Sequence, residues 1–195
     1  HHGQNMGTID LNLPGIHNVY NATASIAVGV ELDVSFDHIR AALENAEGVQ
    51  RRLEVKGETN DVTVIDDYGH HPTEIKVTLD AIEENWPGRR KVVVFQPHRY
   101  SRTQALFDEF SRAFYQSDAL VVMPIYAASE KKIEGVSAKK LCEKIKAHGH
   151  KEVMYADGLK AVLSYLKNNL QPGDVLLTLG AGDVWKVGEE VLKKL

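Results

Sequence analysis

The sequence has 195 residues, of which 43% are hydrophobic and 26% are charged, and its formal net charge at pH 7 is −4. This length suits one packed domain plus a smaller piece, and the composition excludes a disordered, collagen-like or membrane-spanning chain. An acidic balance gives no basic footprint for nucleic acid, so we expect no nucleic-acid partner and no membrane partner.

The first residues carry no secretory pattern of charge followed by an apolar run. His1 and His2 resemble the remains of an affinity tag, and we assign them no metal. Cys142 is the single cysteine, so the chain has no intrachain disulfide and fits a reducing cytoplasm. It lies in an amphipathic run, where we expect a small packing residue rather than a nucleophile.

Residues 1–48 have the pattern of an incomplete domain. The sequence predicts a short strand at 8–13, a turn at Pro14 and Gly15, a helix at 18–30, and a helix at 35–46 that Ser35 caps. One strand and two helices offer little around which to bury a core. We therefore expect these residues to be the end of a preceding domain, with a boundary near Gly48.

From residue 61 onward the pattern is that of an α/β domain. Short β-branched runs at 61–68, 91–97, 119–126, 152–156 and 174–180 alternate with amphipathic stretches at 73–85, 103–116, 137–148, 158–169 and 183–194. This alternation predicts a Rossmann-like, doubly wound, mostly parallel sheet covered by helices on both faces. The run 51–58 is expected to add an antiparallel edge strand, so the predicted domain covers residues 49–195.

Polar clusters follow four of the predicted strands: DDYGHHP at 66–72, QPHRYSR at 96–102, PIYAASE at 124–130 and GAGD at 180–183. Ligands of open α/β sheets bind beyond the carboxyl ends of the strands, so we expect a site there. The guanidinium groups of Arg99 and Arg102 suit a carboxylate or phosphate; the alternative is that they form exposed salt bridges.

The first of these clusters permits several chemistries. Asp66 and Asp67 could hold Mg²⁺, accept hydrogen bonds from a ribose or cap the next helix. His70 and His71 could orient a substrate, move a proton or bind a metal, although adjacent histidines are weak zinc ligands. We expect one of the two to be structural, and His70 is the better candidate for the site.

The glycine-containing segments complete no nucleotide motif. GAGDVW at 180–185 begins like a dinucleotide fingerprint, but Trp185 stands where the third glycine belongs, which argues against an NAD-dependent oxidoreductase. The chain also contains no G-x-x-x-x-G-K-S/T loop to cradle nucleotide phosphates.

Four segments resemble the Mur ligase family and its alanine-adding branch: HNVYNA, GVQRRLE, DDYGHHPTEI and FQPHRYSRT. They occur in the family's order and spacing, and the resemblance covers residues 7–195. Enzymes of this family have a domain for the UDP-sugar, a central ATPase with the P-loop and a C-terminal Rossmann-like domain. The resemblance implies that residues 1–48 end the central domain, that 49–195 form the C-terminal one, and that the missing N-terminal and central domains are partners.

The resemblance further implies an ATP- and Mg²⁺-dependent, cytoplasmic ligation in peptidoglycan precursor synthesis. The carboxylate of UDP-N-acetylmuramate is phosphorylated to an acyl phosphate, and the amine of L-alanine then attacks it and releases phosphate. Because this chain lacks a P-loop, we expect it to be inactive by itself. A murein peptide ligase, which uses a tripeptide in place of alanine, and a non-catalytic ligand-binding module stay open as alternatives.

The resemblance also implies roles for individual residues, although it assigns no catalytic residue and no metal ligand. In the loop at 124–130 the chain departs from the family, because Pro124 replaces an acidic residue and Ser129 a common glycine, so that loop receives no role. The implied nucleotide-binding residues are Asn18, Asn21, Arg52 and Asp67, and those implied around the incoming alanine are Tyr68, His70, Arg99 and Arg102.

Overall fold

The computed structural model describes residues 5–13, 15–46 and 48–194. His1 and His2, interpreted above as tag remains, and Pro14, the predicted turn residue, lie outside them. The chain divides into two compact units, residues 1–49 (unit 1) and 50–195 (unit 2).

Unit 1 contains the helices α1 (Ile16–Glu31) and α2 (Phe36–Glu44), which agree with the two predicted helices. The predicted cap is present, because Ser35 Oγ accepts a hydrogen bond from His38 N. Among the described hydrophobic side chains of this unit, only Ala22 and Ile39 are buried, whereas Tyr20 and Leu32 are 69% and 70% exposed. Much of the apolar surface of unit 1 is therefore exposed to solvent.

The strand predicted at 8–13 is wrong. These residues form no strand, because the described part of unit 1 contains no second strand with which to pair. Their polar groups bond to the end of α2 instead. Asp10 N donates to Glu44 Oε1 and Asn12 Nδ2 donates to the main-chain oxygen of Glu44.

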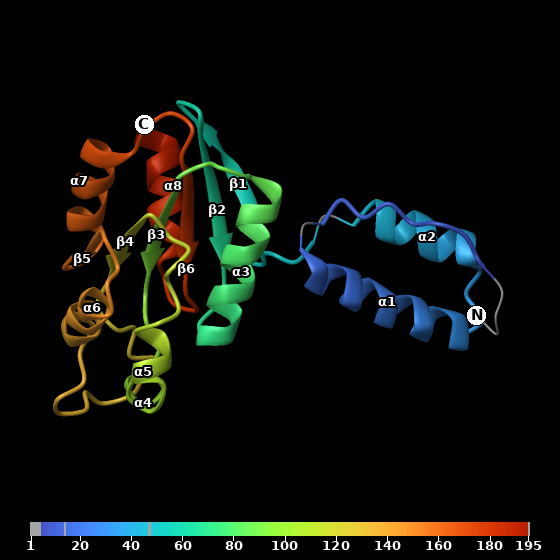
Figure 1. Ribbon diagram of the computed structural model, residues 1–195. Coiled ribbons are helices and arrows are strands. Elements are labelled where there is room, and N and C mark those ends of the chain that lie inside the picture. The colour runs from blue at the N-terminus through green and yellow to red at the C-terminus, as the bar shows by residue number, and fades with distance from the viewer. Residues whose placement is uncertain (1–4, 14, 47, 195) are drawn as a thin grey trace. The chain divides into compact units, whose positions relative to one another are not determined.

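Unit 2 is built on a six-stranded sheet with the order β1-β2-β6-β3-β4-β5 (Figure 1). β1 pairs antiparallel with β2, and the other four pairings are parallel, which confirms the predicted mostly parallel sheet with an antiparallel edge strand. The strands are β1 (Glu54–Thr59), β2 (Val62–Asp67), β3 (Lys91–Phe95), β4 (Ala119–Val122), β5 (Val153–Tyr155) and β6 (Val175–Leu179).

Helices cover both faces of this sheet. Alternate residues of each strand point to opposite faces and so pack against different helices. Val93 and Phe95 pack in a core with α3, α5 and α6, whereas Val92 and Val94 pack in a second core with α7 and α8. No described helix has the length and apolar character needed to cross a bilayer. The helices of unit 2 are α3 (Pro72–Asn85), α4 (Tyr100–Ala105), α5 (Phe107–Phe110), α6 (Ala138–Ala147), α7 (Leu159–Asn169) and α8 (Trp185–Lys194).

The single helix predicted at 103–116 is wrong in its continuity. Helical backbone is interrupted at Leu106 (φ −114°, ψ 26°) and stops at Phe110. Ser111 Oγ donates to a main-chain carbonyl three residues earlier, a bond that competes with a helix. Phe110 and Phe114 both pack on Phe95, at ring-centroid distances of 5.6 and 4.9 Å. Tertiary packing therefore overrides the local helical pattern.

The topology positions a site at one edge of the sheet. From β5 the chain returns through α7 to β6, which lies between β2 and β3, so the direction of winding reverses at β6. The carboxyl ends of β2, β6 and β3 consequently lie side by side at a topological switch point, where ligands of doubly wound sheets bind.

Candidate functional site

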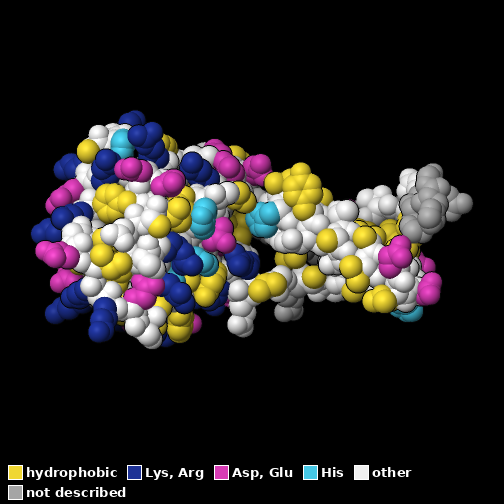
Figure 2. Space-filling view, turned by 90° about the horizontal axis from the view of Figure 1, so that it is seen from below, with side chains coloured by type: hydrophobic (Ala, Val, Ile, Leu, Met, Phe, Trp, Pro, Cys, Tyr) yellow, Lys and Arg dark blue, Asp and Glu magenta, His cyan; other side chains and the backbone are white. Residues whose placement is uncertain are grey.

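The loops that follow β2, β3 and β4 meet at the carboxyl edge of the sheet. The rings of Tyr68 and His70 are 5.3 Å apart and perpendicular, those of His70 and His98 are 5.9 Å apart, and those of His98 and Tyr126 are 5.6 Å apart and nearly parallel. Figure 2 views the molecule from below Figure 1, the side toward which the strands run, and shows histidine, basic and acidic side chains gathered there. We name this group the strand-end cluster: Tyr68, His70, His98, Arg99, Arg102 and Tyr126.

Arg99 has a strained backbone at the start of α4. Its φ of 70° and ψ of 140° lie in a region that residues other than glycine rarely adopt, at a cost of about 1–3 kcal/mol. Two bonds hold this conformation: Arg99 N donates to the main-chain oxygen of Tyr126 (2.8 Å), and Thr103 Oγ1 donates to the main-chain oxygen of Arg99 (2.8 Å). The guanidinium is exposed and forms no ion pair with the described residues.

Arg102 lies one turn further along α4. Its Nη1 is 3.2 Å from Nδ1 of His98, which brings a second guanidinium into the strand-end cluster. Among the described residues His98 is the hydrogen-bond partner of this guanidinium, so its other N–H groups are available to an anion.

The loop after β4, to which the sequence assigned no role, supports the arginine loop. Tyr126 N donates to the main-chain oxygen of Pro97 (2.8 Å). The carboxylate of Glu130 accepts hydrogen bonds from Ser101 N (3.0 Å) and Ser101 Oγ (2.6 Å), and these bonds lower the pKa of Glu130. Ser129 adopts a φ of 70°, which favours glycine and explains why a glycine would suit this position.

The two histidines of the first cluster have different tasks. His71 caps α3: its ring accepts from Thr73 N, while Glu74 at the third helical position accepts from His71 N, forming a capping box. His70 belongs to the strand-end cluster, and its Nδ1 lies 3.0 Å from the main-chain oxygen of Tyr68. His71 is thus the structural member of the pair.

Asp66 and Arg51 form a buried ion pair that the sequence did not reveal. Arg51 Nε donates to Asp66 Oδ2 (2.8 Å), and the other nitrogens of its guanidinium donate to the main-chain oxygens of Gly180 and Gly182. Thr178 Oγ1 donates to the second oxygen of Asp66 (2.6 Å). Asp66 therefore ties β2 to β6 and to the turn after β6, and it caps no helix.

The two implied nucleotide-binding residues of unit 2 differ in access. The side chain of Arg52 is 49% exposed, lies 4.0 Å from Glu74 and stacks 5.7 Å from the ring centre of Tyr68. Asp67 is only 5% exposed, and its two oxygens accept from Leu53 N (2.8 Å) and Gly69 N (2.7 Å). Burial raises the pKa of Asp67 despite these bonds. Arg52 can reach a ligand, whereas Asp67 is engaged by main-chain groups.

The glycines of the GAGD turn allow close approach to the chain itself. A Cβ on Gly180, whose φ is +146°, would lie 2.6 Å from the main-chain oxygen of Gln96. A Cβ on Gly182 would clash with Gln96 Oε1 and would lie 2.7 Å from Tyr126. Gln96 Nε2 also donates to Asp183 Oδ1 (2.8 Å). The turn after β6 is thereby locked against the loops after β3 and β4.

The remaining candidates lie elsewhere. Asn18 and Asn21 both lie on α1 of unit 1, whereas the strand-end cluster belongs to unit 2. Within the described ranges, no three His, Cys, Asp or Glu side chains group closely enough to hold a metal ion. Cys142 lies buried on α6, and burial raises the pKa of its thiol, as suits a packing residue.

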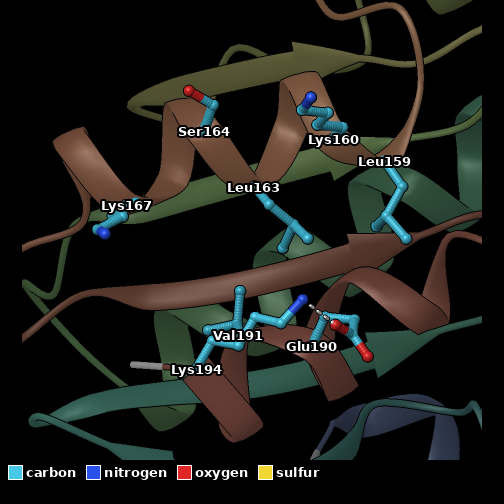
Figure 3. A pocket seen from close by; sticks show the side chains of 8 residues that line it. All are labelled: Leu159, Lys160, Leu163, Ser164, Lys167, Glu190, Val191 and Lys194. Atoms are coloured by element: carbon cyan, nitrogen blue, oxygen red, sulfur yellow. Dashed lines mark ion pairs between the residues drawn. The ribbon is translucent and has the colours of Figure 1, made fainter.

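The structure also contains a groove of about 650 Å³ between α7 and α8, drawn in Figure 3. Leu159 and Leu163 of α7 and Val191 of α8 line it, and an ion pair between Lys194 and Glu190 lies at its side. It shares no residue with the strand-end cluster.

Comparison with known proteins is consistent with this arrangement. Residues 51–182 match the family model described as "Mur ligase, glutamate ligase domain". A UDP-N-acetylmuramate--L-alanine ligase of Desulfosudis oleivorans is 62% identical over 189 residues, which are 97% of this chain and 41% of that protein. The chain thus spans about two fifths of the length of this relative.

Among solved structures, the UDP-N-acetylmuramate-alanine ligase MurC of Thermotoga maritima superposes with a TM-score of 0.80 and 30% identity, over 95% of this chain and 39% of that one. A murein peptide ligase of Psychrobacter arcticus has the same fold, with a TM-score of 0.70 and 22% identity, over 95% of this chain and 38% of that one. With its family model, its fold and its strand-end motifs in agreement, the chain belongs to the Mur ligase family through the glutamate ligase domain that residues 51–182 match.

Proposed function

We propose that this chain is the amino-acid-binding part of a ligase that joins L-alanine to UDP-N-acetylmuramate in peptidoglycan precursor synthesis. The observation that carries the proposal is the 62% identity to a UDP-N-acetylmuramate--L-alanine ligase along nearly the whole chain. ATP and a UDP-sugar are its proposed cosubstrates, which places the reaction in the cytoplasm.

The strand-end cluster supports binding of a free amino acid. Arg99 and Arg102 present two guanidinium groups, and a planar fork pairs well with an α-carboxylate. The strained backbone of Arg99 is held by bonds to Tyr126 and Thr103, an arrangement that is typical of functional sites. In this role the arginines hold the carboxylate of alanine and leave its amine directed away from them.

The proposed reaction has two steps. An oxygen of the sugar carboxylate attacks the γ-phosphorus of ATP and ADP leaves; the alanine amine then attacks the carbonyl carbon, phosphate leaves and the nitrogen loses a proton. The contribution of this chain is to position the amine, and well-oriented reactants gain several kcal/mol over free ones. A single methyl group gives only about 1–3 kcal/mol of selectivity, so glycine and serine are expected to be poorer acceptors rather than inert ones.

The residues of this chain fit ATP only in part. The guanidinium of Arg52 is half exposed and only weakly balanced by Glu74 at 4.0 Å, so it suits a phosphate oxygen. Asp67 would need to turn away from the main-chain groups that it now accepts from before it could receive a ribose hydroxyl. Among the described residues no three His, Cys, Asp or Glu side chains gather closely enough to hold a metal ion, and the proposal gives this chain no Mg²⁺ ligand.

Unit 1 supports a larger assembly. Its described residues include Tyr20, Val28 and Leu32, each at least 60% exposed, and such apolar surface is usually covered. In the proposal these side chains pack inside a central ATP-binding domain, which also provides the P-loop. Asn18 and Asn21 on α1 then belong to the nucleotide site of that domain.

The proposal is tested by phosphate release from the full-length ligase, with ATP, UDP-N-acetylmuramate and, separately, L-alanine, glycine, L-serine or tripeptide. The expected result is a strong preference for alanine. Preference for tripeptide would move the assignment to a murein peptide ligase, and absence of turnover with all four would leave a ligand-binding module. The 195-residue chain by itself is expected to release no phosphate.

A matched pair of variants tests the arginine role. Arg99→Ala is expected to reduce kcat/KM for alanine roughly 10- to 150-fold, the value of one charge-assisted interaction, and to leave the KM for ATP unchanged. Arg112→Ala serves as the control, because Arg112 is an exposed arginine outside the strand-end cluster. Equal losses for alanine and ATP would contradict the assigned role.

A further inference from the structure

His98 lies at the centre of the strand-end cluster, and no function has been assigned to it above. It is half-buried between two other rings, with His70 at 5.9 Å and Tyr126 stacked on it at 5.6 Å with an interplanar angle of 9°. Its Nδ1 is 3.2 Å from Nη1 of Arg102. The ring therefore connects the loop after β4 to one of the two arginines.

The direction of the bond between His98 and Arg102 follows from the chemistry of its partners. A guanidinium group donates hydrogen bonds and never accepts them, so Nδ1 of His98 has to be the acceptor. An accepting Nδ1 carries no proton, which means that the ring is neutral and holds its proton on Nε2. Protonation of Nδ1 would set two donors against each other and break the contact.

The charges around His98 favour the neutral ring. Burial lowers its pKa first, and the positive charges of Arg102, His70 and Arg99 lower it further, while Glu130 opposes them. The phenol of Tyr126, on the remaining side, adds a neutral face. With three basic groups and one acid facing it, the ring keeps its acceptor at a pH where an ordinary histidine begins to lose it.

The contact matters because it holds one rotamer of the Arg102 side chain. Among the described residues His98 is the hydrogen-bond partner of its guanidinium. An arginine side chain has many rotamers, and fixing one of them before a ligand arrives reduces the entropic cost of binding. Tyr126 fixes the plane of the His98 ring, and the ring in turn fixes one nitrogen of the fork.

We infer that His98 is a positioning residue for the carboxylate of the amino-acid substrate: as the neutral Nε2–H tautomer stacked on Tyr126, it orients the guanidinium of Arg102. The inference deepens the proposed function and rests on it for the identity of the carboxylate. The contact and the tautomer are properties of this chain and hold whatever the ligand.

The first test reads the tautomer directly. Two-bond ¹⁵N–¹H spectra of the histidine rings are recorded on the 195-residue chain, and the signals of His98 among the nine histidines are identified by their loss in His98→Asn. At pH 7.5 we expect a proton on Nε2 of His98 and none on Nδ1. In Arg102→Met, which removes the donor to Nδ1, we expect both tautomers of the His98 ring to be populated. A proton on Nδ1, or a charged ring, overturns the inference without any bearing on the ligase activity.

The second test uses the full-length ligase. His98→Ala removes the acceptor and is expected to raise the KM for alanine roughly 3- to 10-fold, as for one ordinary hydrogen bond, with little change in kcat or in the KM for ATP. His98→Asn places an amide oxygen near Nδ1 and is expected to recover most of this loss. If the two variants have the same KM for alanine, the positioning role is refuted.

The pH profile separates positioning from a packing role. In the wild type the KM for alanine is expected to rise as the pH falls below 6.5 and through the lowered pKa of His98, because protonation releases Arg102. The amide of His98→Asn does not titrate there, so its profile is expected to lack this rise. A profile in His98→Asn that matches the wild type contradicts the inference.

Discussion

Replacing Arg51 with alanine is expected to destabilise unit 2 by about 3–5 kcal/mol, whereas replacing its neighbour Arg52 costs at most about 1 kcal/mol. Arg51 Nε donates to Asp66 Oδ2 at 2.8 Å, and the side chain of Asp66 is only 2% exposed. Without the guanidinium this carboxylate keeps Thr178 as its side-chain partner and becomes an uncompensated buried charge. Arg52, by contrast, is half exposed and 4.0 Å from the nearest acid.

Urea unfolding followed by tryptophan fluorescence measures this difference in unit 2. Trp86 and Trp185 are the two tryptophans of the chain, and both lie in unit 2, so unfolding of unit 1 does not enter the signal. At an m-value of about 2 kcal/mol per molar urea, the midpoint of Arg51→Ala should fall by about 1.5–2.5 M. The midpoint of Arg52→Ala should move by less than about 0.5 M.

A double variant tests the cause of the loss. If the unpaired charge dominates, Arg51→Ala with Asp66→Asn is expected to be more stable than Arg51→Ala alone, since the amide carries no charge to desolvate. The reasoning is refuted if the two arginine variants unfold within about 0.5 M of each other, or if adding Asp66→Asn lowers the midpoint further.

Three further predictions concern backbone, core and pH. Gly180→Ala is expected to lower the free energy of unfolding by about 2–5 kcal/mol, because φ is +146° there and a main-chain oxygen lies 2.6 Å from the new Cβ. Gly88→Ala, at a φ of +73° in open space, should lower it by about 1 kcal/mol. Thermal melts compare the two variants. Phe95→Ala should lower the free energy of unfolding by about 3–5 kcal/mol, because its buried ring contacts two phenylalanines; a loss below 1.5 kcal/mol contradicts this packing. Burial lowers the pKa of His150 below its ordinary 6.5, so the unfolded chain binds more protons and stability falls as the pH drops below 6.5; His150→Gln should lose part of that fall between pH 8 and pH 5.

The strands could be predicted because parallel strands buried on both faces leave an unambiguous pattern. Val92, Val93 and Val94 are all buried, on alternating sides, and such a run reads as a strand without any tertiary knowledge. The break at Leu106 could not be predicted in the same way, because the phenylalanine contacts responsible for it reach β3 across the core.

The sequence predicts where the candidate site lies but not the role of each residue in it. The strand ends predicted which loops meet at the carboxyl edge of the sheet. The cap role of His71 was not predicted, although Pro72 and Glu74 follow it at the positions of a capping box. The structural role of Arg51, in contrast to its neighbour Arg52, follows from its bond to Gly180, which lies 129 residues away in the sequence. The strain at Arg99 was equally hidden, because a positive φ at arginine leaves no trace in the sequence.

The contact between the GAGD turn and Gln96 limits how the site can diversify. A Cβ at Gly180 or Gly182 would meet Gln96, and at Gly182 also Tyr126, so the turn packs directly on the loops after β3 and β4 and its position follows from the register of β6 against β3. Point substitutions there would disturb the sheet before they altered a ligand's fit. Under the proposed function, a change of amino-acid preference is therefore expected from side chains of the strand-end cluster, such as His70 and Arg99, rather than from this turn.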